Sequence, residues 1–342
     1  MKNIYLRRLF RFPLSCFLFL SGGFYSAFLW AEPVRLNYAF FAPAQTFPAI
    51  QMEKWADELN KRTGVKVNTF PGGTLLSASN MFDGVESGVA DIGLSVVSYD
   101  PQRFPLLSLT GSLTGMDKNG RIASQVLYRL IKEFPEHVGL DNFKVITAFA
   151  SEPAYLQTNT PIINLKDMQG LEVRVPSNAA DAVRALGGVP VILSHADTAE
   201  AIQTGIVDGN VSSREVLKDL QLARTLKYVV DYPLINAVMI AVMNKDKWES
   251  LPDNIKVAID ELGSEMAYFA GNYLDNHIAS VMNWSKEEHQ LTVISLSPEE
   301  REKWNEALHP VNEAMLKSVE SKGLPAYALH KRQKELINQY KN

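Results

Sequence analysis

Hydrophobic and polar residues follow two different periods along most of the chain. Segments typical of β-strands occur at residues 34–40, 65–70, 92–97, 143–149, 171–175, 189–193 and 237–243. Between them lie segments with apolar residues three or four positions apart, the spacing of a helix that buries one face. This alternation predicts an α/β protein with mostly parallel sheets and helices on both faces, and two sheets rather than one.

The C-terminal third of the chain shows a longer helical pattern. From Pro252 it can run unbroken for about 30 residues towards Glu288, which corresponds to about 45 Å. Because such a helix exceeds the diameter of one small lobe, we expect it to brace two. We assign residues 32–151 and about 240–279 to lobe I, and residues 152–239 and about 280–342 to lobe II.

The first 31 residues differ from the rest of the chain. They carry four basic residues and no acidic one, followed by a mainly apolar run that ends at Ala31. This composition predicts a secretory signal peptide, residues 1–31, cleaved near Ala31. A membrane anchor is disfavoured because serines and glycines interrupt the run. The pair Arg7-Arg8 partly resembles a twin-arginine signal and leaves the export route open.

Charge and cysteine content narrow the class of protein further. The chain has 34 basic and 38 acidic residues, and loss of the signal leaves a net charge of about −8, which disfavours nucleic acid as a partner. The one cysteine, Cys16, lies in the signal, so the mature chain has neither a disulfide nor a thiol nucleophile.

The sequence lacks the common motifs of enzymes. No two of its six histidines stand three or four residues apart, and it contains no P-loop, G-x-G-x-x-G or G-x-S-x-G motif. No pair of carboxylates is marked as a general acid and base. We therefore predict a binding protein without catalytic residues, cofactor or metal.

One arginine stands where an α/β sheet collects ligands. Arg174 alternates with apolar residues in the strand 171–175, and Pro176 ends that strand. Ser177 and Asn178 then offer N-cap oxygens to a short helix. A guanidinium keeps its charge and binds a carboxylate through two parallel hydrogen bonds, so this stretch predicts a carboxylate receptor. A structural salt bridge to an acid of the protein is the competing interpretation.

Several motifs occur in order at separations typical of one family. They are LKDMQGLEVRVP at residues 165–176, AIQTGIVDG at 201–209, FPGGTL at 70–75, GVAD at 88–91 and KWESLP at 247–252. From about Val34 to Glu320 the chain resembles the DctP-type periplasmic solute-binding subunit of TRAP (tripartite ATP-independent periplasmic) transporters.

This resemblance implies a periplasmic binding protein fold, in which two lobes joined by crossing strands and a long helix close over an organic acid. It implies that Arg174 grips the carboxylate of the ligand. It also implies that the closed complex docks on a two-subunit TRAP membrane permease driven by a sodium gradient. We expect a monomer in the periplasm that binds a small-molecule carboxylate.

The chain departs from the family pattern at other positions of the pocket. Where members that bind sugar acids or dicarboxylates carry polar groups, the resemblance places Phe41, Val96 and Ala154. Ser212 stands in place of an asparagine, and His195 in place of an aromatic residue. The full set of expected ligand-binding residues is Arg174, Ser212, Asn210, His195, Phe41, Phe40, Val96, Ala154 and Tyr155.

These departures indicate the class of ligand. One bidentate contact contributes about 1.5–3 kcal/mol, whereas micromolar binding requires about 8 kcal/mol. Burial of about 250 Å² of apolar ligand surface supplies about 6 kcal/mol before ordering costs. We therefore expect a monocarboxylate with an aromatic or branched apolar body. The alternatives are a ligand receptor for a sensor kinase and, less favoured, a periplasmic enzyme.

Overall fold

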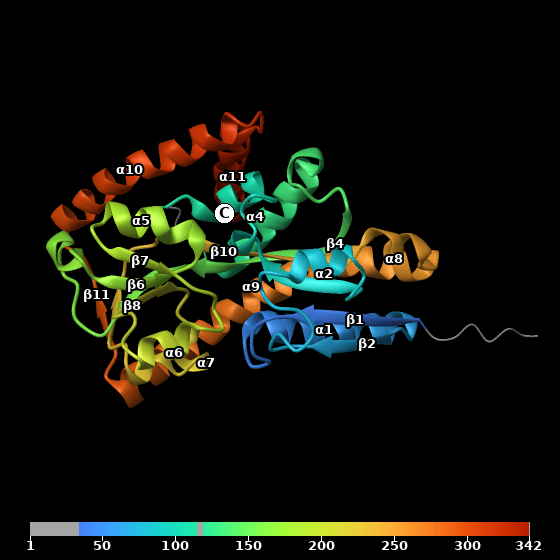
Figure 1. The fold of residues 1–342 in the computed structure, drawn as a ribbon, viewed down its shortest axis with the longest axis horizontal. Coiled ribbons are helices and arrows are strands. Elements are labelled where there is room, and N and C mark those ends of the chain that lie inside the picture. The colour runs from blue at the N-terminus through green and yellow to red at the C-terminus, as the bar shows by residue number, and fades with distance from the viewer. Residues whose placement is uncertain (1–33, 115–118, 342) are drawn as a thin grey trace, which may run out of the picture. The chain divides into compact units, whose positions relative to one another are not determined.

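A five-stranded sheet forms from the first strands of the chain and one late strand. β1 (Arg35–Phe40) pairs in parallel with β2 (Lys66–Phe70) and β3 (Ile92–Val96). β10 (Asn236–Asn244) is antiparallel to both β3 and β4 (Phe143–Pro153), which gives the order β2-β1-β3-β10-β4 (Figure 1). The computed structural model describes residues 34–114 and 119–341, and the expected signal peptide lies outside them.

A six-stranded sheet forms from the middle of the chain. Its order is β11-β9-β5-β8-β6-β7. The bounds of its strands are β5 (Tyr155–Thr158), β6 (Glu172–Val175), β7 (Val189–Ile192), β8 (Gly209–Ser212), β9 (Tyr228–Val230) and β11 (Thr292–Ile294).

Helices connect the strands and cover both sheets. α1, α2, α3, α4 and α9 contact the five-stranded sheet, and α5 contacts the six-stranded one. The bounds are α1 (Phe47–Thr63), α2 (Met81–Glu86), α3 (Pro105–Ser112), α4 (Gly120–Glu133), α5 (Ala180–Ala185), α6 (Thr198–Gln203), α7 (Val216–Asp219), α8 (Lys245–Ser250), α9 (Asp253–His289), α10 (Pro298–Glu320) and α11 (Ala326–Lys341). Short 3-10 helices are η1 (Val97–Tyr99), η2 (Pro135–His137), η3 (Leu165–Met168), η4 (Ser177–Ala179) and η5 (Leu222–Arg224).

The predicted α/β architecture with two sheets and a long bracing helix is confirmed. The antiparallel pairs in both sheets all involve β10 or β5. Neither strand is reached through a strand–helix–strand crossover within one sheet. The chain passes directly from β4 in the five-stranded sheet to β5 in the six-stranded sheet, and it passes back from β9 to β10. The remaining pairs between described strands are parallel, as the alternation predicts.

Two chain segments cross side by side from one sheet to the other. β4 leads through Ala154 directly into β5, and the segment before β10 runs in the opposite direction beside it. The N–H of Ala154 donates to the carbonyl of Ile235 (2.5 Å), and the N–H of Leu234 donates to the carbonyl of Ala154 (3.0 Å). These bonds extend the β4–β10 ladder across the junction and make it a two-stranded connection.

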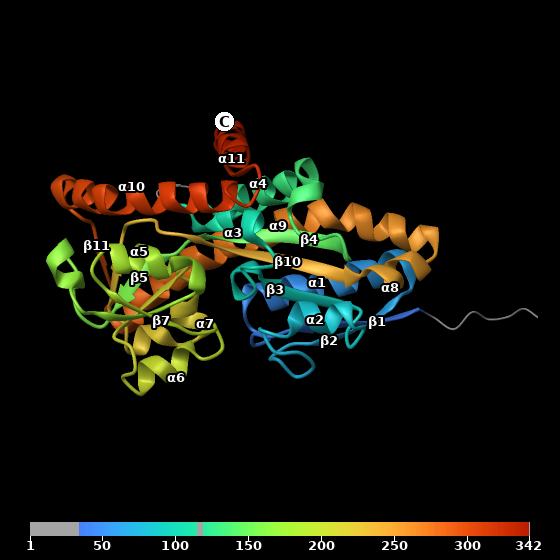
Figure 2. The same cartoon turned by 45° about the horizontal axis from the view of Figure 1, so that its top comes forward.

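Helix α9 passes along both sheets, as Figure 2 shows. It contains 37 residues, about 56 Å at 1.5 Å per residue, and it begins and ends close to the predicted bounds. Helix α9 packs on β4, α1 and α4 at the five-stranded sheet. It also contacts α7 and η5, which connect β8 to β9 of the six-stranded sheet. No helix within the described residues is both long and apolar enough to span a membrane.

The last two helices differ from the expected division into lobes. Trp304 and Leu308 in the first half of α10 pack with the core of the six-stranded sheet. Leu316 and Val319 in its second half pack with α3 and α4, together with apolar residues of α11. α10 is therefore a second helix that bridges the two parts, and α11 lies with the helices of the first sheet, although residues 280–342 were expected in lobe II.

Candidate functional site

A cavity of about 670 Å³, its open mouth included, lies where residues of the two sheets meet. The ends of β1 and β3 and the residues after them line it from the first sheet, and β6 and the segment after β8 line it from the second. The crossing segments close it at the junction through Ser151, Ala154, Ile235 and Ala237. Ligands of α/β proteins collect at such junctions beyond strand ends.

Arg174 enters this cavity from the central part of β6. Its strand lies between β7 and β8, so the side chain is only 2% exposed although it points away from the apolar residues of its own strand. Nε and Nη2 donate to the carbonyl of Leu193 at 3.0 and 2.8 Å, and Nη1 donates to Oδ1 of Asn210 at 3.4 Å. All three bonds go to neutral acceptors, which fix the direction of the guanidinium without neutralising it.

No carboxylate within the described part of the chain forms an ion pair with Arg174. Burial lowers the pKa of its guanidinium below the ordinary value, against smaller opposing effects of Tyr99 and Asp197. Asp197 acts through its charge alone, and its Oδ2 accepts a hydrogen bond from Ser194 (2.5 Å). The interpretation of Arg174 as a structural salt bridge therefore does not hold.

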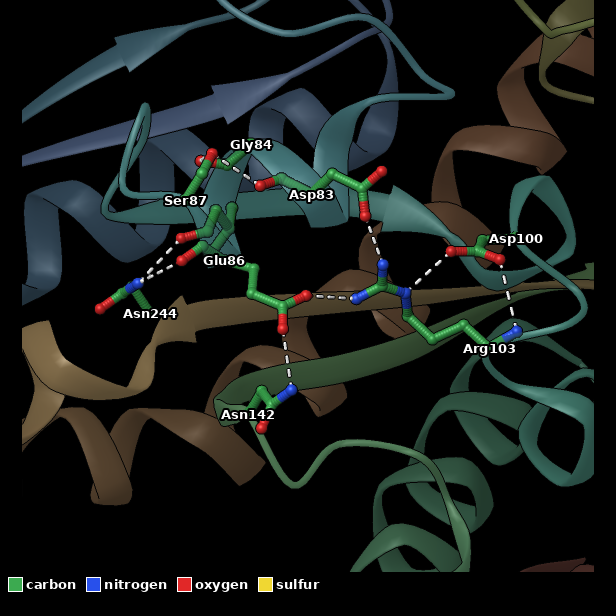
Figure 3. Close-up of polar contacts among 9 residues, drawn as sticks. Asp83, Gly84, Glu86, Ser87, Asp100, Arg103, Asn142 and Asn244 are labelled. Atoms are coloured by element: carbon green, nitrogen blue, oxygen red, sulfur yellow. Dashed lines mark hydrogen bonds and ion pairs between the residues drawn. The ribbon is translucent and has the colours of Figure 1, made fainter.

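Arg103 shows how this protein neutralises an arginine that has a structural role (Figure 3). Its Nε lies 2.9 Å from Oδ2 of Asp100 and its Nη1 lies 2.8 Å from Oε2 of Glu86, and Nη2 pairs with Asp83. Three carboxylates thus surround one guanidinium on the surface of the first sheet. Arg174, by contrast, has no such set of carboxylate partners among the described residues.

His195 and Tyr99 join the two halves of the cavity beside Arg174. The N–H of His195 donates to the hydroxyl of Tyr99 at 3.0 Å, and the hydroxyl of Ser177 donates to the carbonyl of Ser98. Burial and the charge of Arg174 lower the pKa of His195 to about 3. The imidazole is therefore neutral, and it offers hydrogen bonds to a ligand rather than a second positive charge.

Apolar side chains form much of the remaining wall. Phe40, Phe41 and Val96 line the cavity from the first sheet, and Ala154 lines it at the junction. The ring centroids of Phe40 and Phe41 lie 4.9 Å apart, and those of Phe41 and Tyr99 lie 5.3 Å apart. This wall suits a flat apolar body.

The cavity also has an acidic part. Glu215, which precedes α7, and Asp219, its last residue, both line it together with Ser213. Oε1 of Glu215 accepts a hydrogen bond from the hydroxyl of Ser213 (2.7 Å), and Oδ1 of Asp219 lies 2.7 Å from Nε2 of His277. These residues, like Tyr99 and Phe47, were not predicted from the sequence.

Most, but not all, of the expected site residues meet at the cavity. Arg174, His195, Ser212, Phe40, Phe41, Val96 and Ala154 line it. Asn210 and Tyr155 are not among the lining residues. Asn210 is fully buried behind Arg174, and the ring of Tyr155 faces the guanidinium of Arg214, 4.5 Å from its centroid. Ser177 and Asn178 do not form the predicted N-cap, since neither of the short helices after β6 has a side-chain cap.

The fold and the site together define a class of protein. A buried guanidinium without an ion pair among the described residues lines a largely apolar cavity between two linked sheets, an arrangement typical of two-lobed binding proteins for anionic solutes. Within the described residues, no group of three or more histidine, cysteine or acidic side chains is arranged to hold a metal ion.

Comparison with known proteins agrees with this class. Residues 38–318 match the family described as bacterial extracellular solute-binding protein, family 7 (DctP). The chain belongs to this family of periplasmic TRAP solute-binding proteins, and it is a binding protein rather than an enzyme. A curated relative, the C4-dicarboxylate-binding periplasmic protein DctP of Rhodobacter capsulatus, is 21% identical over 313 residues, which cover 86% of this chain and 90% of the relative.

Two solved structures show the same fold. A TRAP periplasmic solute-binding protein from Desulfovibrio salexigens is 36% identical, with a TM-score of 0.81 over 90% of this chain and 96% of that one. It was solved as an open complex with the C-terminus of a symmetry mate in its ligand-binding site. A TRAP protein from a marine metagenome, specific for aromatic acid ligands and solved with 3-hydroxybenzoate, is 26% identical, with a TM-score of 0.84 over 91% and 99% of the two chains.

Proposed function

We propose that this protein captures a monocarboxylate with an apolar or aromatic body and delivers it to a TRAP-type secondary transporter. The observation that carries the proposal is the buried guanidinium of Arg174, which has no carboxylate partner within the described residues. A buried charge is unfavourable unless it is paired. A ligand carboxylate supplies that pair, and the bonds to Leu193 and Asn210 hold the guanidinium ready for it.

The charges of the cavity favour one carboxylate over two. Arg174 is the single lysine or arginine among the lining residues in the described part of the chain, and His195 is neutral. A second carboxylate would meet the acidic part of the wall instead of a cation. The marine metagenome relative is specific for aromatic acids, which supports an apolar body, whereas the Rhodobacter capsulatus relative is a C4-dicarboxylate-binding protein.

In this proposal the two lobes close over the ligand. We assign residues 32–151 and about 240–279 to lobe I and residues 152–239 and about 280–342 to lobe II, with α11 of that last segment packed on α3 and α4 of lobe I. The bonds from His195 to Tyr99 and from Ser177 to Ser98 then belong to the closed form. Closure excludes water, which strengthens the ion pair with Arg174. Export to the periplasm with cleavage near Ala31 completes the proposed path.

A ligand screen tests the binding half of this proposal. Thermal shift followed by calorimetry is carried out with aromatic, branched and 2-oxo monocarboxylates, short dicarboxylates and sugar acids. Because a ligand that binds only the folded form raises its midpoint, we expect stabilisation by apolar monocarboxylates. Tight binding of a dicarboxylate or sugar acid, with apolar monocarboxylates silent, would overturn it.

The delivery half is tested separately. The genes beside this one are expected to encode the two membrane subunits of a TRAP permease. Uptake of the bound acid by membrane vesicles that carry these subunits should depend on the added binding protein and on a sodium gradient. A neighbouring sensor kinase, with no uptake in the vesicles, would instead support a receptor function.

A further inference from the structure

We propose that Glu215 determines specificity by binding a hydroxyl group that the ligand carries away from its carboxylate. This inference rests on the proposed function and narrows its ligand class to hydroxylated apolar monocarboxylates. It concerns the acidic part of the cavity. In the proposed function, the carboxylate and the apolar body of the ligand contact other parts of the cavity wall, so the acidic part has no role there.

Glu215 is a buried carboxyl group, and one of its two oxygens has no hydrogen-bond partner among the described residues. The residue is 4% exposed and lines the cavity. Its Oε1 accepts a hydrogen bond from the hydroxyl of Ser213 at 2.7 Å. Its Oε2 is buried and has no hydrogen-bond partner among the described residues. Because an unsatisfied buried polar atom is costly, a partner is expected from the cavity that Glu215 lines.

Two neighbouring acids determine which carboxyl holds a proton. Glu152 is paired with Arg214 at 2.6 Å, and Asp219 is paired with His277 at 2.7 Å. Glu215 has no such basic partner in the described part of the chain. Burial, together with the charges of Glu152 and Asp219, raises its pKa to about 8, against the opposing bond from Ser213. At neutral pH the proton therefore lies on Glu215, and Oε2, which accepts no bond, is the oxygen that carries it.

The carboxylate receptor and Glu215 are separate poles of one cavity. Arg174 lines the cavity from β6, whereas Glu215 lines it from the residue before α7. The acids that raise the pKa of Glu215 are Glu152 and Asp219, whereas the acid that acts on Arg174 is Asp197. A ligand that places its carboxylate on Arg174 presents a different part of its body to Glu215.

The chemistry of this second pole selects a hydroxyl group. The protonated oxygen of Glu215 donates a hydrogen bond, and Oδ2 of Asp219, buried in the cavity wall without a partner among the described residues, accepts one. A hydroxyl group can accept from the first and donate to the second. A second carboxylate is repelled by the nearby acids, and an ammonium group cannot accept the proton that Glu215 offers.

Matched pairs of acids test this inference. The affinities of the purified protein for benzoate, 3-hydroxybenzoate, 4-hydroxybenzoate, isophthalate and 3-(aminomethyl)benzoate are measured by calorimetry. We expect one hydroxybenzoate to bind about tenfold more tightly than benzoate, the gain of one good hydrogen bond to a buried group. The same titrations are repeated with Glu215→Leu and Glu215→Gln. Glu306→Gln, on the exposed face of α10, is the control.

The variants are judged by the ratio of the two affinities, which a general loss of stability does not change. Glu215→Leu should reduce the preference for the hydroxylated acid about tenfold. Glu215→Gln keeps an N–H donor of the same shape, so it should retain the preference even if the leucine variant does not fold. The control should match the wild type.

A pH series separates a proton donor from a merely structural glutamate. The charged groups around Glu215 are Glu152 on β4 with its partner Arg214, and Asp219 at the end of α7 with its partner His277 on α9. The preference for the hydroxylated acid should fall above about pH 8 in the wild type and stay level in Glu215→Gln.

The outcomes distinguish this inference from the function on which it rests. Wild-type protein that binds none of the monocarboxylates overturns both. Protein that binds benzoate and both hydroxybenzoates equally, or prefers the amine, overturns the role of Glu215 alone. A preference for isophthalate overturns that role together with the proposed choice of one carboxylate over two. A preference that Glu215→Leu leaves unchanged also overturns it.

Discussion

Replacement of Arg174 by methionine separates a ligand-binding arginine from a structural one. The substitution removes the charge but keeps a long apolar side chain in a site that is 2% exposed. If the guanidinium awaits a carboxylate, its loss should abolish binding while the ligand-free fold survives. A structural arginine would show the reverse.

The expected magnitudes differ strongly between binding and stability. Truncation of one partner of a buried, hydrogen-bonded charge pair costs about 2–5 kcal/mol, or roughly 30-fold to several-thousand-fold in affinity. In the ligand-free protein, Arg174→Met loses its bonds to Leu193 and Asn210 but also relieves the burial of an unpaired charge. These opposing effects are each about 1–4 kcal/mol, so the net change in the free energy of unfolding should be small.

Arg103→Met supplies the matched control. Arg103 pairs with Asp83, Glu86 and Asp100 outside the cavity (Figure 3), and its side chain is 26% exposed. Its replacement should lower the free energy of unfolding by about 1–2 kcal/mol, because three carboxylates lose their shared cation, and should leave ligand affinity unchanged. Calorimetry and urea unfolding measure both quantities. An affinity of Arg174→Met within about threefold of the wild type, or a loss of stability larger than that of Arg103→Met, would refute the reasoning.

Three further predictions follow from the same site. Burial and nearby charges raise the pKa of Glu215 from 4.5 to about 8, so the folded state holds this proton more tightly than the unfolded chain. The free energy of unfolding should therefore fall as pH rises from about 4.5 to about 8, by at most about 5 kcal/mol. Urea unfolding at pH 5 and pH 8 should show a smaller fall in Glu215→Gln than in the wild type. Equal falls in the two proteins would contradict this. Because the pKa of His195 lies near 3, the affinity for benzoate should not change between about pH 5 and 7. If calorimetry instead shows a change in affinity near pH 6.5, and His195→Gln removes that change, the imidazole is charged. Phe41→Ala should weaken calorimetric binding of an aromatic acid by about 1–3 kcal/mol and that of acetate less; equal losses would place Phe41 outside the contact with the ligand body.

The features that could be predicted from the sequence depend on local pattern. Arg174 is detectable because it alternates with apolar residues in a strand that Pro176 ends. The long helix is detectable because its apolar spacing continues from residue 253 to 289. Both are properties of a short window of the chain. The two sheets follow from the alternation of such windows.

The features that were missed depend on contacts between distant residues. The raised pKa of Glu215 results first from its burial and then from the charges of Glu152 and Asp219. The partners of these two acids, Arg214 and His277, lie 62 and 58 positions away from them. The antiparallel strands and the place of α11 likewise depend on how the chain returns across the junction. A usable signal was nevertheless present, because Tyr99 and Glu215 each stand three residues after the end of a strand, β3 and β8 respectively.

A crystal structure of the protein with a bound aromatic monocarboxylate tests the central claim most directly. The account predicts that both carboxylate oxygens lie within hydrogen-bond distance of the Arg174 guanidinium, about 2.7–2.9 Å from its nitrogens, with the apolar body against Phe41. A structure in which Arg174 keeps only its bonds to Leu193 and Asn210, or pairs with an acid of the protein, while the ligand binds elsewhere, would contradict it.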